Sequence, residues 1–186
     1  MSKSTAVPGS FTRYTAVQQL SRPQALAGAA VLAALHLILN QLTIPVSPYL
    51  QIGFDFLTMA VTGMLYGPWV AGMSGVITDL LGYMLRPNGP YFPGWTLSAF
   101  LIGMLYGLIF YNRPVTLRRV IVARLLMVVI FNFFLTPLWL SMLYGKAFVL
   151  MSSMRFIKNV IKFPIDVALL LAVLNLADRE VRRRMQ

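Results

Sequence analysis

The chain has no cysteine, a single histidine and only five acidic residues in 186. The lack of cysteine excludes disulfide bonds and thiolate metal sites, and one histidine alone makes no metal site. Charged residues make up 11% of the sequence, against about 25% in an average soluble domain. Hydrophobic residues make up 58%, and the mean hydropathy is +0.73. This composition predicts an integral membrane protein.

Two further absences narrow the class. No glycine-rich loop of the P-loop type is present, so the chain does not hydrolyse ATP by that route. Strict alternation of apolar and polar residues is also missing, which favours helices as the membrane-spanning elements. Segments rich in proline and glycine separate the apolar stretches. We therefore predict an all-α membrane protein with six transmembrane helices, at 24–43, 53–66, 69–85, 94–111, 120–143 and 151–177.

The basic residues predict the orientation, because short cytoplasmic loops retain positive charge. The net charge of +11 is therefore interpreted as topology and not as nucleic acid binding. A layout with both termini inside places these residues on the cytoplasmic side: Lys3, Arg13, Arg22, Arg113, Arg118, Arg119, Arg179, Arg182, Arg183 and Arg184. Only Arg86 and Lys146 fall opposite. We predict a cytoplasmic segment 1–23, a membrane domain 24–177, and a basic cytoplasmic tail 178–186 that lies against the lipid headgroups.

The first predicted span carries a ridge of alanines. Ala25, Ala29 and Ala33 recur every four residues, and Ala30 and Ala34 form a parallel row. Small side chains at this spacing let another helix approach closely, and such packing drives helix association in lipid. The ridge could serve internal packing, but it is long enough to bind an external partner. We predict that these five alanines contact a partner helix.

Glycine pairs recur at the same spacing in later spans, at Gly63 and Gly67 and at Gly103 and Gly107. Here we favour packing within the bundle of the protein itself. The second span is expected to end at Gly67-Pro68, since proline interrupts the helical hydrogen bonds.

One short motif suggests an enzyme. The sequence "GMSG" at 72–75 has the G-x-S-G form found around the nucleophile of rhomboid intramembrane proteases, and His36 could supply a base. A rhomboid pairs its serine with a histidine from a later helix, and no histidine follows position 36. Gly72 and Gly75 are better explained as close-packing residues, and His36 as a packed or hydrogen-bonded histidine.

The last predicted span begins with charged residues that share one helical face. Arg155, Lys158, Lys162 and Asp166 are spaced by three, four and four residues, with Asn159 at the edge. Lys162 and Asp166 can form an i, i+4 ion pair. Arg155 and Lys158 have no acidic partner nearby in the sequence, so an anionic ligand is a candidate partner. The alternative is that Arg155 extends to the membrane surface.

Aromatic and amide side chains are predicted at the same membrane level. The fifth span places Asn132, Thr136 and Trp139 on one face, and the connection before the fourth span supplies Tyr91, Phe92 and Trp95. Aromatic planes beside hydrogen-bonding and cationic groups suit a flat heterocycle with a negatively charged tail. An interfacial aromatic belt would use similar residues without forming a site. Because three segments converge, we favour a binding site.

Three segments give the chain a resemblance to a known family. At "GPYFPGWTLSAF", "LWLSMLYGKAF" and "RFIKNVIKFPI" the sequence resembles the substrate-binding S components of energy-coupling factor (ECF) transporters, specifically the folate-type group, over residues 25–175. The resemblance implies a six-helix subunit without enzymatic activity or cofactor, in a prokaryotic plasma membrane. It implies that folate binds in an outward-facing pocket, and that the subunit docks on a transmembrane T component served by two cytosolic ATPases.

The resemblance also assigns roles to residues. It favours Ala30 and Ala34 as the contact with the T component, and a lid function for the loop 43–51. We hypothesise that Arg155 and Lys158 attract the anionic part of folate, and that Asp166, or secondly Asp79, accepts hydrogen bonds from the pterin. The remaining ligand-binding candidates are Trp95 and Trp139 with Tyr91 or Phe92 around the rings, and Asn132, Thr136 and Asn159 at ring heteroatoms.

Some residues depart from the family pattern. Thr136-Pro137 stands where "NT" is expected, Asp166 stands where glutamine is expected, and Lys162 is unexpected. These changes could mark a relative specialised for another form of folate. Three alternatives stay open: an S component for pantothenate or a deazapurine precursor, a rhomboid-like protease, and a purely structural subunit that binds no ligand.

Overall fold

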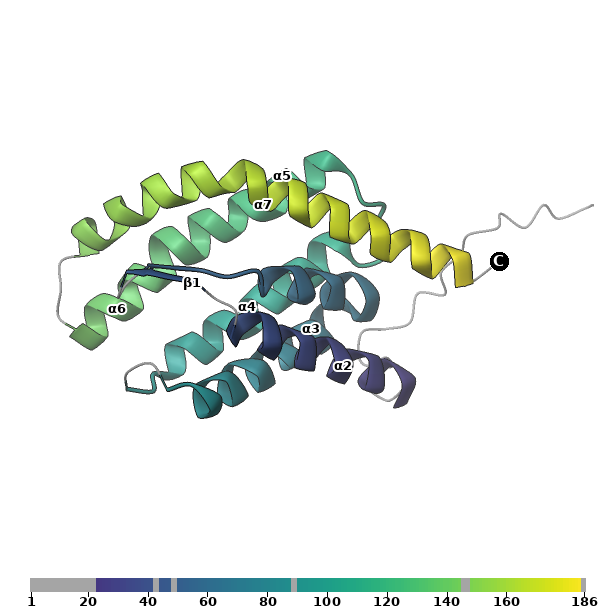
Figure 1. Cartoon of the computed structure of the whole chain (residues 1–186), viewed down its shortest axis with the longest axis horizontal. Coiled ribbons are helices and arrows are strands. Elements are labelled where there is room, and N and C mark those ends of the chain that lie inside the picture. Colours follow the sequence, from purple (N-terminus) through teal and green to yellow (C-terminus); the bar gives the residue numbers. More distant parts are fainter. Residues whose placement is uncertain (1–22, 42–43, 48–49, 88–89, 145–147, 185–186) are drawn as a thin grey trace, which may run out of the picture.

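The computed structural model describes residues 23–41, 44–47, 50–87, 90–144 and 148–184 as a helical bundle (Figure 1). Its elements are α2 (Pro23–Gln41), β1 (Ile44–Ser47), β2 (Leu50–Ile52), α3 (Phe56–Leu85), α4 (Pro93–Phe110), α5 (Leu117–Leu126), the π-helix η1 (Met127–Leu135), α6 (Thr136–Tyr144) and α7 (Phe148–Arg184). In Figure 1, α7 lies along α5, η1 and α6, whereas α2, α3 and α4 form the other side.

The structure contains long apolar helices, as expected of an integral membrane protein. Within the described ranges, three helical stretches are long and apolar enough to span a bilayer: Phe56–Leu85, Pro93–Phe110 and Leu117–Leu143. A fourth, Leu26–Gln41, is apolar but shorter. An interior of apolar side chains from α3, α4, α5, η1 and α7 holds these helices together, with Tyr106, Phe110, Leu170 and Leu174 completely buried.

Gly67 divides α3 into two parts. Its φ of 83° and ψ of 177° are not helical, and Pro68 follows directly. A Cβ atom placed on Gly75 would lie 3.4 Å from the Met59 side chain, although a straight helix would separate these residues by about 24 Å. The chain therefore folds back at Gly67, where only glycine adopts this conformation without strain. The predicted break at Gly67-Pro68 is confirmed.

Glycines bring α3 and α4 into backbone contact. A Cβ on Gly63 would lie 2.7 Å from the Gly107 nitrogen, and one on Gly103 would collide with the Ala71 carbonyl. Gly72 and Gly75 lie equally close to α4, against Phe100 and Ala99. These contacts confirm that the glycines serve packing inside the bundle.

We expect Gly103→Ala to lower stability by about 1–3 kcal/mol, because the added methyl group meets backbone atoms that cannot move aside. Gly82→Ala is the matched control. Its Cβ would meet only Leu37 Cδ2, at 3.8 Å, and an alanine in a helix is favoured by about 0.5–1 kcal/mol over glycine. The free energy of unfolding in detergent should fall for Gly103→Ala and should not fall for Gly82→Ala. An equal decrease in both variants would contradict the close packing of α3 on α4.

The fifth predicted span, 120–143, corresponds to α5, η1 and α6 together. The prediction was right in extent but did not include the π-helix. Thr136 N–H donates to the Phe131 carbonyl, the i to i−5 bond of a π turn, and Pro137 has no amide hydrogen to donate. Met127, Phe131, Asn132 and Thr136 of this segment line one cavity.

The connection after α2 contains a short hairpin that the sequence analysis did not predict. Strands β1 and β2 are antiparallel, with Ile44 opposite Ile52. β-branched residues and the fixed φ of Pro45 favour this extended backbone. The all-α prediction is therefore correct for the helices and is extended by this hairpin.

The predicted alanine ridge is divided by the packing of α2. Ala29 is 6% exposed and Ala33 is half-buried, whereas Ala30 and Ala34 are exposed. The side chain of Ala25 lies outside the described residues. The row of Ala30 and Ala34 is thus the one available to a partner.

The structure describes nearly all of the C-terminal end of the chain but not its first 22 residues. Helix α7 continues without a break to Arg184, so most of the predicted tail 178–186 is part of this helix. Residues 1–22 of the predicted N-terminal segment lie outside the described residues.

Candidate functional site

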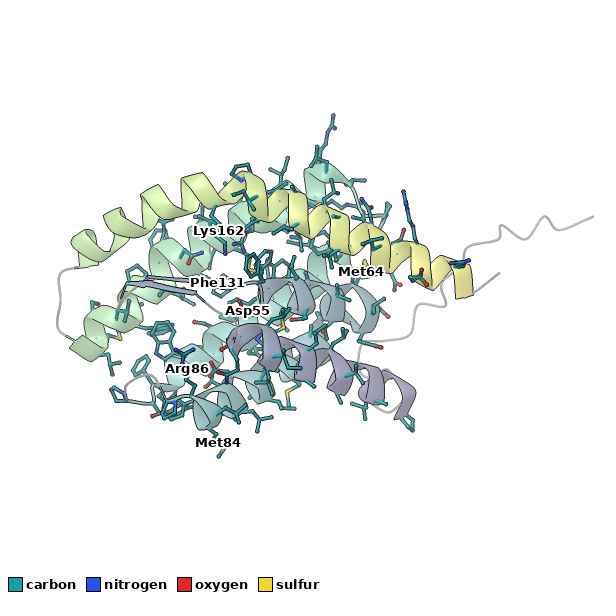
Figure 2. All side chains as sticks on the ribbon, in the orientation of Figure 1. Asp55, Met64, Met84, Arg86, Phe131 and Lys162 are labelled. Atoms are coloured by element: carbon teal, nitrogen blue, oxygen red, sulfur yellow. The ribbon has the colours of Figure 1, made fainter. Side chains whose placement is uncertain are left out.

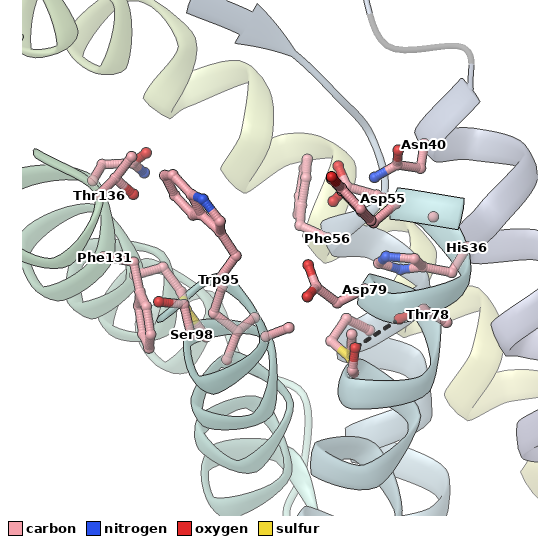
Figure 3. A pocket seen from close by; sticks show the side chains of 18 of the residues that line it. His36, Asn40, Asp55, Phe56, Thr78, Asp79, Trp95, Ser98, Phe131 and Thr136 are labelled. Carbon is pink, nitrogen blue, oxygen red and sulfur yellow. Dashed lines mark hydrogen bonds between the residues drawn. The ribbon is translucent and has the colours of Figure 1, made fainter. Parts of the chain in front are cut away.

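A cavity of about 550 Å³ lies between α2, α3, α4 and the α5–η1–α6 segment (Figure 3). This volume is in the range of sites for small organic molecules. The lining combines three kinds of side chain: carboxylates with a histidine, aromatic rings with amides and hydroxyls, and arginines. A ligand that carries both hydrogen-bond donors and acceptors on a flat apolar body would match these walls.

Carboxylates and His36 form one wall. Figure 3 shows Asp55 and Asp79 facing Trp95 across the cavity. His36 Nδ1 lies 3.0 Å from Thr58 Oγ1, and the Thr58 hydroxyl donates its hydrogen to the Asp55 carbonyl at 2.7 Å. A hydroxyl has one hydrogen, so His36 Nδ1 must be the donor in their bond. The predicted hydrogen-bonded role of His36 is confirmed, and the residue also lines the cavity.

Asp79 is oriented by a chain of hydrogen bonds. Thr96 Oγ1 donates to Asp79 Oδ2 at 2.7 Å, and Tyr91 Oη lies 2.7 Å from the same hydroxyl. Because the Thr96 hydrogen goes to the carboxylate, Tyr91 must donate to Thr96. The second oxygen of Asp79, Oδ1, takes no part in this chain and can accept hydrogen bonds from a ligand.

The aromatic candidates separate into two groups. Tyr91 and Trp95 line the cavity, together with Asn132 and Thr136. Phe92 and Trp139 instead pack on each other, with ring centroids 5.5 Å apart, and Trp139 Nε1 donates to Ser98 Oγ at 2.9 Å. Ser98 does line the cavity, so Trp139 supports the wall from behind.

A buried cluster of charges lies beside the cavity at α5 and α7. Arg124 Nη2 donates to Asp166 Oδ2, and Lys162 Nζ lies 3.5 Å from Asp166 Oδ1. The predicted i, i+4 pair of Lys162 and Asp166 is confirmed. Arg124 belongs to the cavity lining, whereas Asp166, which is 1% exposed, stands behind it.

Lys162 also connects α7 to the segment after the hairpin. Its Nζ donates to the Gly53 carbonyl at 2.9 Å and lies 5.4 Å from the centre of the Phe56 ring. The Arg124 guanidinium lies over the same ring, at 4.3 Å. Figure 2 labels Lys162 on α7, Asp55 just before α3, and Arg86 just after the end of α3.

The remaining predicted residues and the missed ones can now be placed. The side chains of Arg155, Lys158 and Asn159, on α7, lie outside the described residues. The sequence analysis did not identify several polar residues of the lining: Asn40, Asp55, Arg86, Tyr106 and Arg124. Within the described part of the chain, no group of three or more acidic or histidine side chains is arranged to hold a metal ion.

A polar cavity inside an apolar helical bundle is the arrangement expected of a membrane protein that binds a small molecule. Residues 24–174 match the family described as "ECF transporter, substrate-specific component". The chain therefore belongs to the S components of ECF transporters, as its resemblance to them predicted.

Individual relatives share most of the chain. The folate transporter FolT of Clostridium novyi (strain NT) is 37% identical over 150 residues, which are 81% of this chain and 87% of that protein. The folate transporter FolT of Leuconostoc mesenteroides subsp. mesenteroides is 35% identical over 152 residues, 78% of this chain and 82% of that one. A solved structure described as "Crystal structure of FolT bound with folic acid" superposes with a TM-score of 0.77 at 38% identity, covering 84% of this chain and 98% of that chain.

Proposed function

We propose that this chain is the folate-binding S component of a vitamin importer. The observation that carries the proposal is the composition of the cavity, which places carboxylates, aromatic rings and a buried arginine around one space. The pterin ring of folate is flat and carries two donors, the N3 hydrogen and the 2-amino group, next to the 4-oxo acceptor. A carboxylate can accept from both donors, and aromatic faces stack on the ring.

Asp79 is the better placed of the two predicted anchors. Its Oδ2 is held by Thr96, and its side chain faces the cavity. Asp166 is engaged by Arg124 and Lys162, so it acts on a ligand through Arg124. Trp95 supplies an aromatic face, and Asn132 and Thr136 supply hydrogen bonds to ring heteroatoms.

The anionic tail of folate requires cations nearer the mouth. Arg86 is exposed and lines the cavity, which makes it one partner for a carboxylate. Arg155 and Lys158, on the first half of α7, are proposed as the others. Pantothenate or a deazapurine precursor is the alternative cargo for this architecture.

The proposal includes the assembly and its orientation. The chain crosses the plasma membrane of a prokaryote six times with both termini in the cytoplasm, and its cavity opens outward. It docks on a T component that is energised by two ATPases, and Ala30 and Ala34 form the docking contact. Support comes from the exposure of both alanines on α2 and from the distribution of lysine and arginine.

Ala34→Leu is expected to disrupt docking without affecting the ligand site. A bulky side chain prevents close approach of helices, so co-purification with the T component and the ATPases should fall at least severalfold. Folic acid affinity should stay unchanged, because Ala34 is not part of the cavity lining. Ala172→Leu, at an exposed alanine of α7, is the matched control. Equal retention of the complex by both variants would dismiss Ala34 as a contact.

A fluorescence titration tests the cargo. Purified protein in detergent is titrated with folic acid, with pantothenate and riboflavin as controls and with correction for ligand absorbance. Saturable quenching by folic acid alone is expected, and Trp95→Phe should lose most of the signal because this ring lines the cavity. Saturable quenching by pantothenate instead would indicate that pantothenate is the cargo. A folded protein that responds to none of them would contradict the proposal.

A further inference from the structure

Two polar atoms of the cavity wall are buried without a hydrogen bond. Among the residues that the structure describes, Tyr106 Oη and Arg124 Nε have no hydrogen-bond partner. Tyr106 is 0% exposed and Arg124 is 8% exposed, and both belong to the cavity lining. The Arg124 guanidinium lies within hydrogen-bonding reach of the Tyr106 side chain, yet Tyr106 Oη and Arg124 Nε have no bond of good geometry. Buried polar groups in proteins are normally paired, so both atoms await a partner from the cavity.

Two cations beside the cavity share one close carboxylate. Arg124 and Lys162 both lie within ion-pair distance of Asp166, and Asp55 of the cavity lining is near enough for its charge to act on Lys162 as well. Charges inside a membrane domain are costly unless they are paired or serve a function. An electronegative atom of a ligand beside Arg124 would further stabilise its charge.

The position of Arg124 is fixed from several sides. Asp166 accepts from Nη2, and the guanidinium plane rests on the Phe56 ring at 4.3 Å. Asp166 is in turn held beside Lys162, whose Nζ is tied to the Gly53 carbonyl at 2.9 Å. Asp166 accepts one of the two hydrogens of Nη2, so part of the guanidinium is already engaged. One N–H from Arg124 and one O–H from Tyr106 suit a single acceptor oxygen.

We infer that Arg124 and Tyr106 bind the ring oxygen of the ligand, and that Asp166 and Lys162 are positioning residues that hold Arg124 for this contact. The inference rests on the proposed function, in which this oxygen is the 4-oxo group of the pterin. The 4-oxo oxygen lies on the same ring edge as the N3 hydrogen and the 2-amino group. This edge therefore needs two donors for the oxygen and a carboxylate for the two hydrogens. Tyr106 and Arg124 supply the donors, and Asp55 and Asp79 supply carboxylates. The ring therefore binds inward, and the charged tail points toward Arg86.

An analogue that changes this ring edge tests the inference. In 4-amino-4-deoxyfolic acid the oxo acceptor is replaced by an amino donor, N3 loses its hydrogen and becomes an acceptor, and the tail is unchanged. The wild-type protein should bind folic acid at least about tenfold more tightly than the analogue, because the amino group meets two donors. Tyr106→Phe and Arg124→Gln should weaken folic acid binding by about tenfold or more and leave the affinity for the analogue equal or higher. The preference for the oxo compound should therefore shrink by about tenfold or more, and only the part due to the N3 hydrogen at the carboxylate should remain.

Arg119→Gln is the matched control for Arg124. Arg119 lies on the same helix, is half-buried, and donates to the Pro114 carbonyl at 2.9 Å outside the cavity. Arg119→Gln should have the same ratio of affinities for folic acid and 4-amino-4-deoxyfolic acid as the wild type. Tyr106→Phe removes a single oxygen atom, so it decides the question even where Arg124→Gln fails to fold.

The positioning role has its own readout. Lys162→Met should reduce the preference for the oxo compound, although Lys162 does not line the cavity, and Lys162→Arg should preserve it. A Lys162→Met protein with lower stability but an unchanged ratio would overturn the positioning role.

The outcomes separate the inference from the proposed function. If the wild type binds folic acid and the Tyr106 and Arg124 variants keep its ratio, the inference is overturned and the proposed function stands. If the folded wild type binds neither compound, both are overturned.

Discussion

Replacing Asp166 with asparagine is expected to lower the free energy of unfolding by about 3–5 kcal/mol. The carboxylate is 1% exposed and accepts from Arg124, with Lys162 at 3.5 Å. Its neutralisation leaves the buried Arg124 and the half-buried Lys162 without this counter-charge, and an uncompensated buried charge is among the largest penalties that a single substitution produces. Unfolding of the purified protein, followed by circular dichroism in detergent, measures the loss.

A control and a second variant make this prediction specific. Glu180→Gln, at an exposed position of the same helix, should change stability by less than about 0.5 kcal/mol. Adding Lys162→Met to Asp166→Asn should recover part of the loss, because one uncompensated charge is removed with the carboxylate. If Asp166→Asn were as mild as Glu180→Gln, the carboxylate would not be neutralising the cluster.

Replacing Asp79 with asparagine is expected to weaken folic acid binding by about ten- to a hundredfold. A hydrogen bond to a charged group contributes about 1.5–3 kcal/mol, and the amide also turns a donor toward the donors of the pterin. Asp79 carries this role because Thr96 fixes Oδ2 at 2.7 Å and leaves Oδ1 to the ligand. Calorimetric titration of the variant measures the loss.

Thr96→Val is a milder variant with which the affinity loss of Asp79→Asn can be compared. It removes the hydroxyl that orients the carboxylate but keeps the charge, so its loss of affinity should be smaller than that of Asp79→Asn. Stability should fall little in either variant, because Asp79 stands at the cavity and not in an ion pair of the buried cluster. Undiminished affinity in a folded Asp79→Asn protein would assign the pterin donors to another acceptor.

Features that depend on neighbouring residues could be predicted from the sequence. The break at Gly67-Pro68 and the pair of Lys162 with Asp166 follow from residues that are adjacent or one turn apart. The extents of the helices could be predicted for the same reason, since apolar runs end at prolines and glycines. The hairpin 44–52 and the π turns of η1 were not predicted, because the same residues are compatible with an ordinary loop and an ordinary helix.

Part of the cavity lining could be predicted from the sequence. Tyr91 and Trp95 were predicted to lie near Asn132 and Thr136, and all four residues line one cavity. Arg124 was missed because its partner, Asp166, is 42 residues away, and Tyr106 because a tyrosine in an apolar span resembles an ordinary packing residue. The available signal was the charge of Arg124 within the predicted span 120–143, since ionisable residues inside a membrane mark functional sites.

The enzyme alternative gains no support from the geometry. The ring of His36 is hydrogen-bonded to Thr58, and Ser74 is buried in a helix whose glycines pack against α4. The family to which the chain belongs consists of substrate-binding transport components. The short motif at 72–75 is therefore explained by helix packing.

The central claim is that this chain binds folate in the cavity between α2, α3, α4 and the α5–η1–α6 segment. Calorimetric titration of the detergent-purified protein with folic acid tests it most directly. We predict saturable heat with one molecule bound per chain, and a loss of that heat in Trp95→Ala. A protein that unfolds cooperatively on heating but gives no saturable heat with folic acid would contradict the claim.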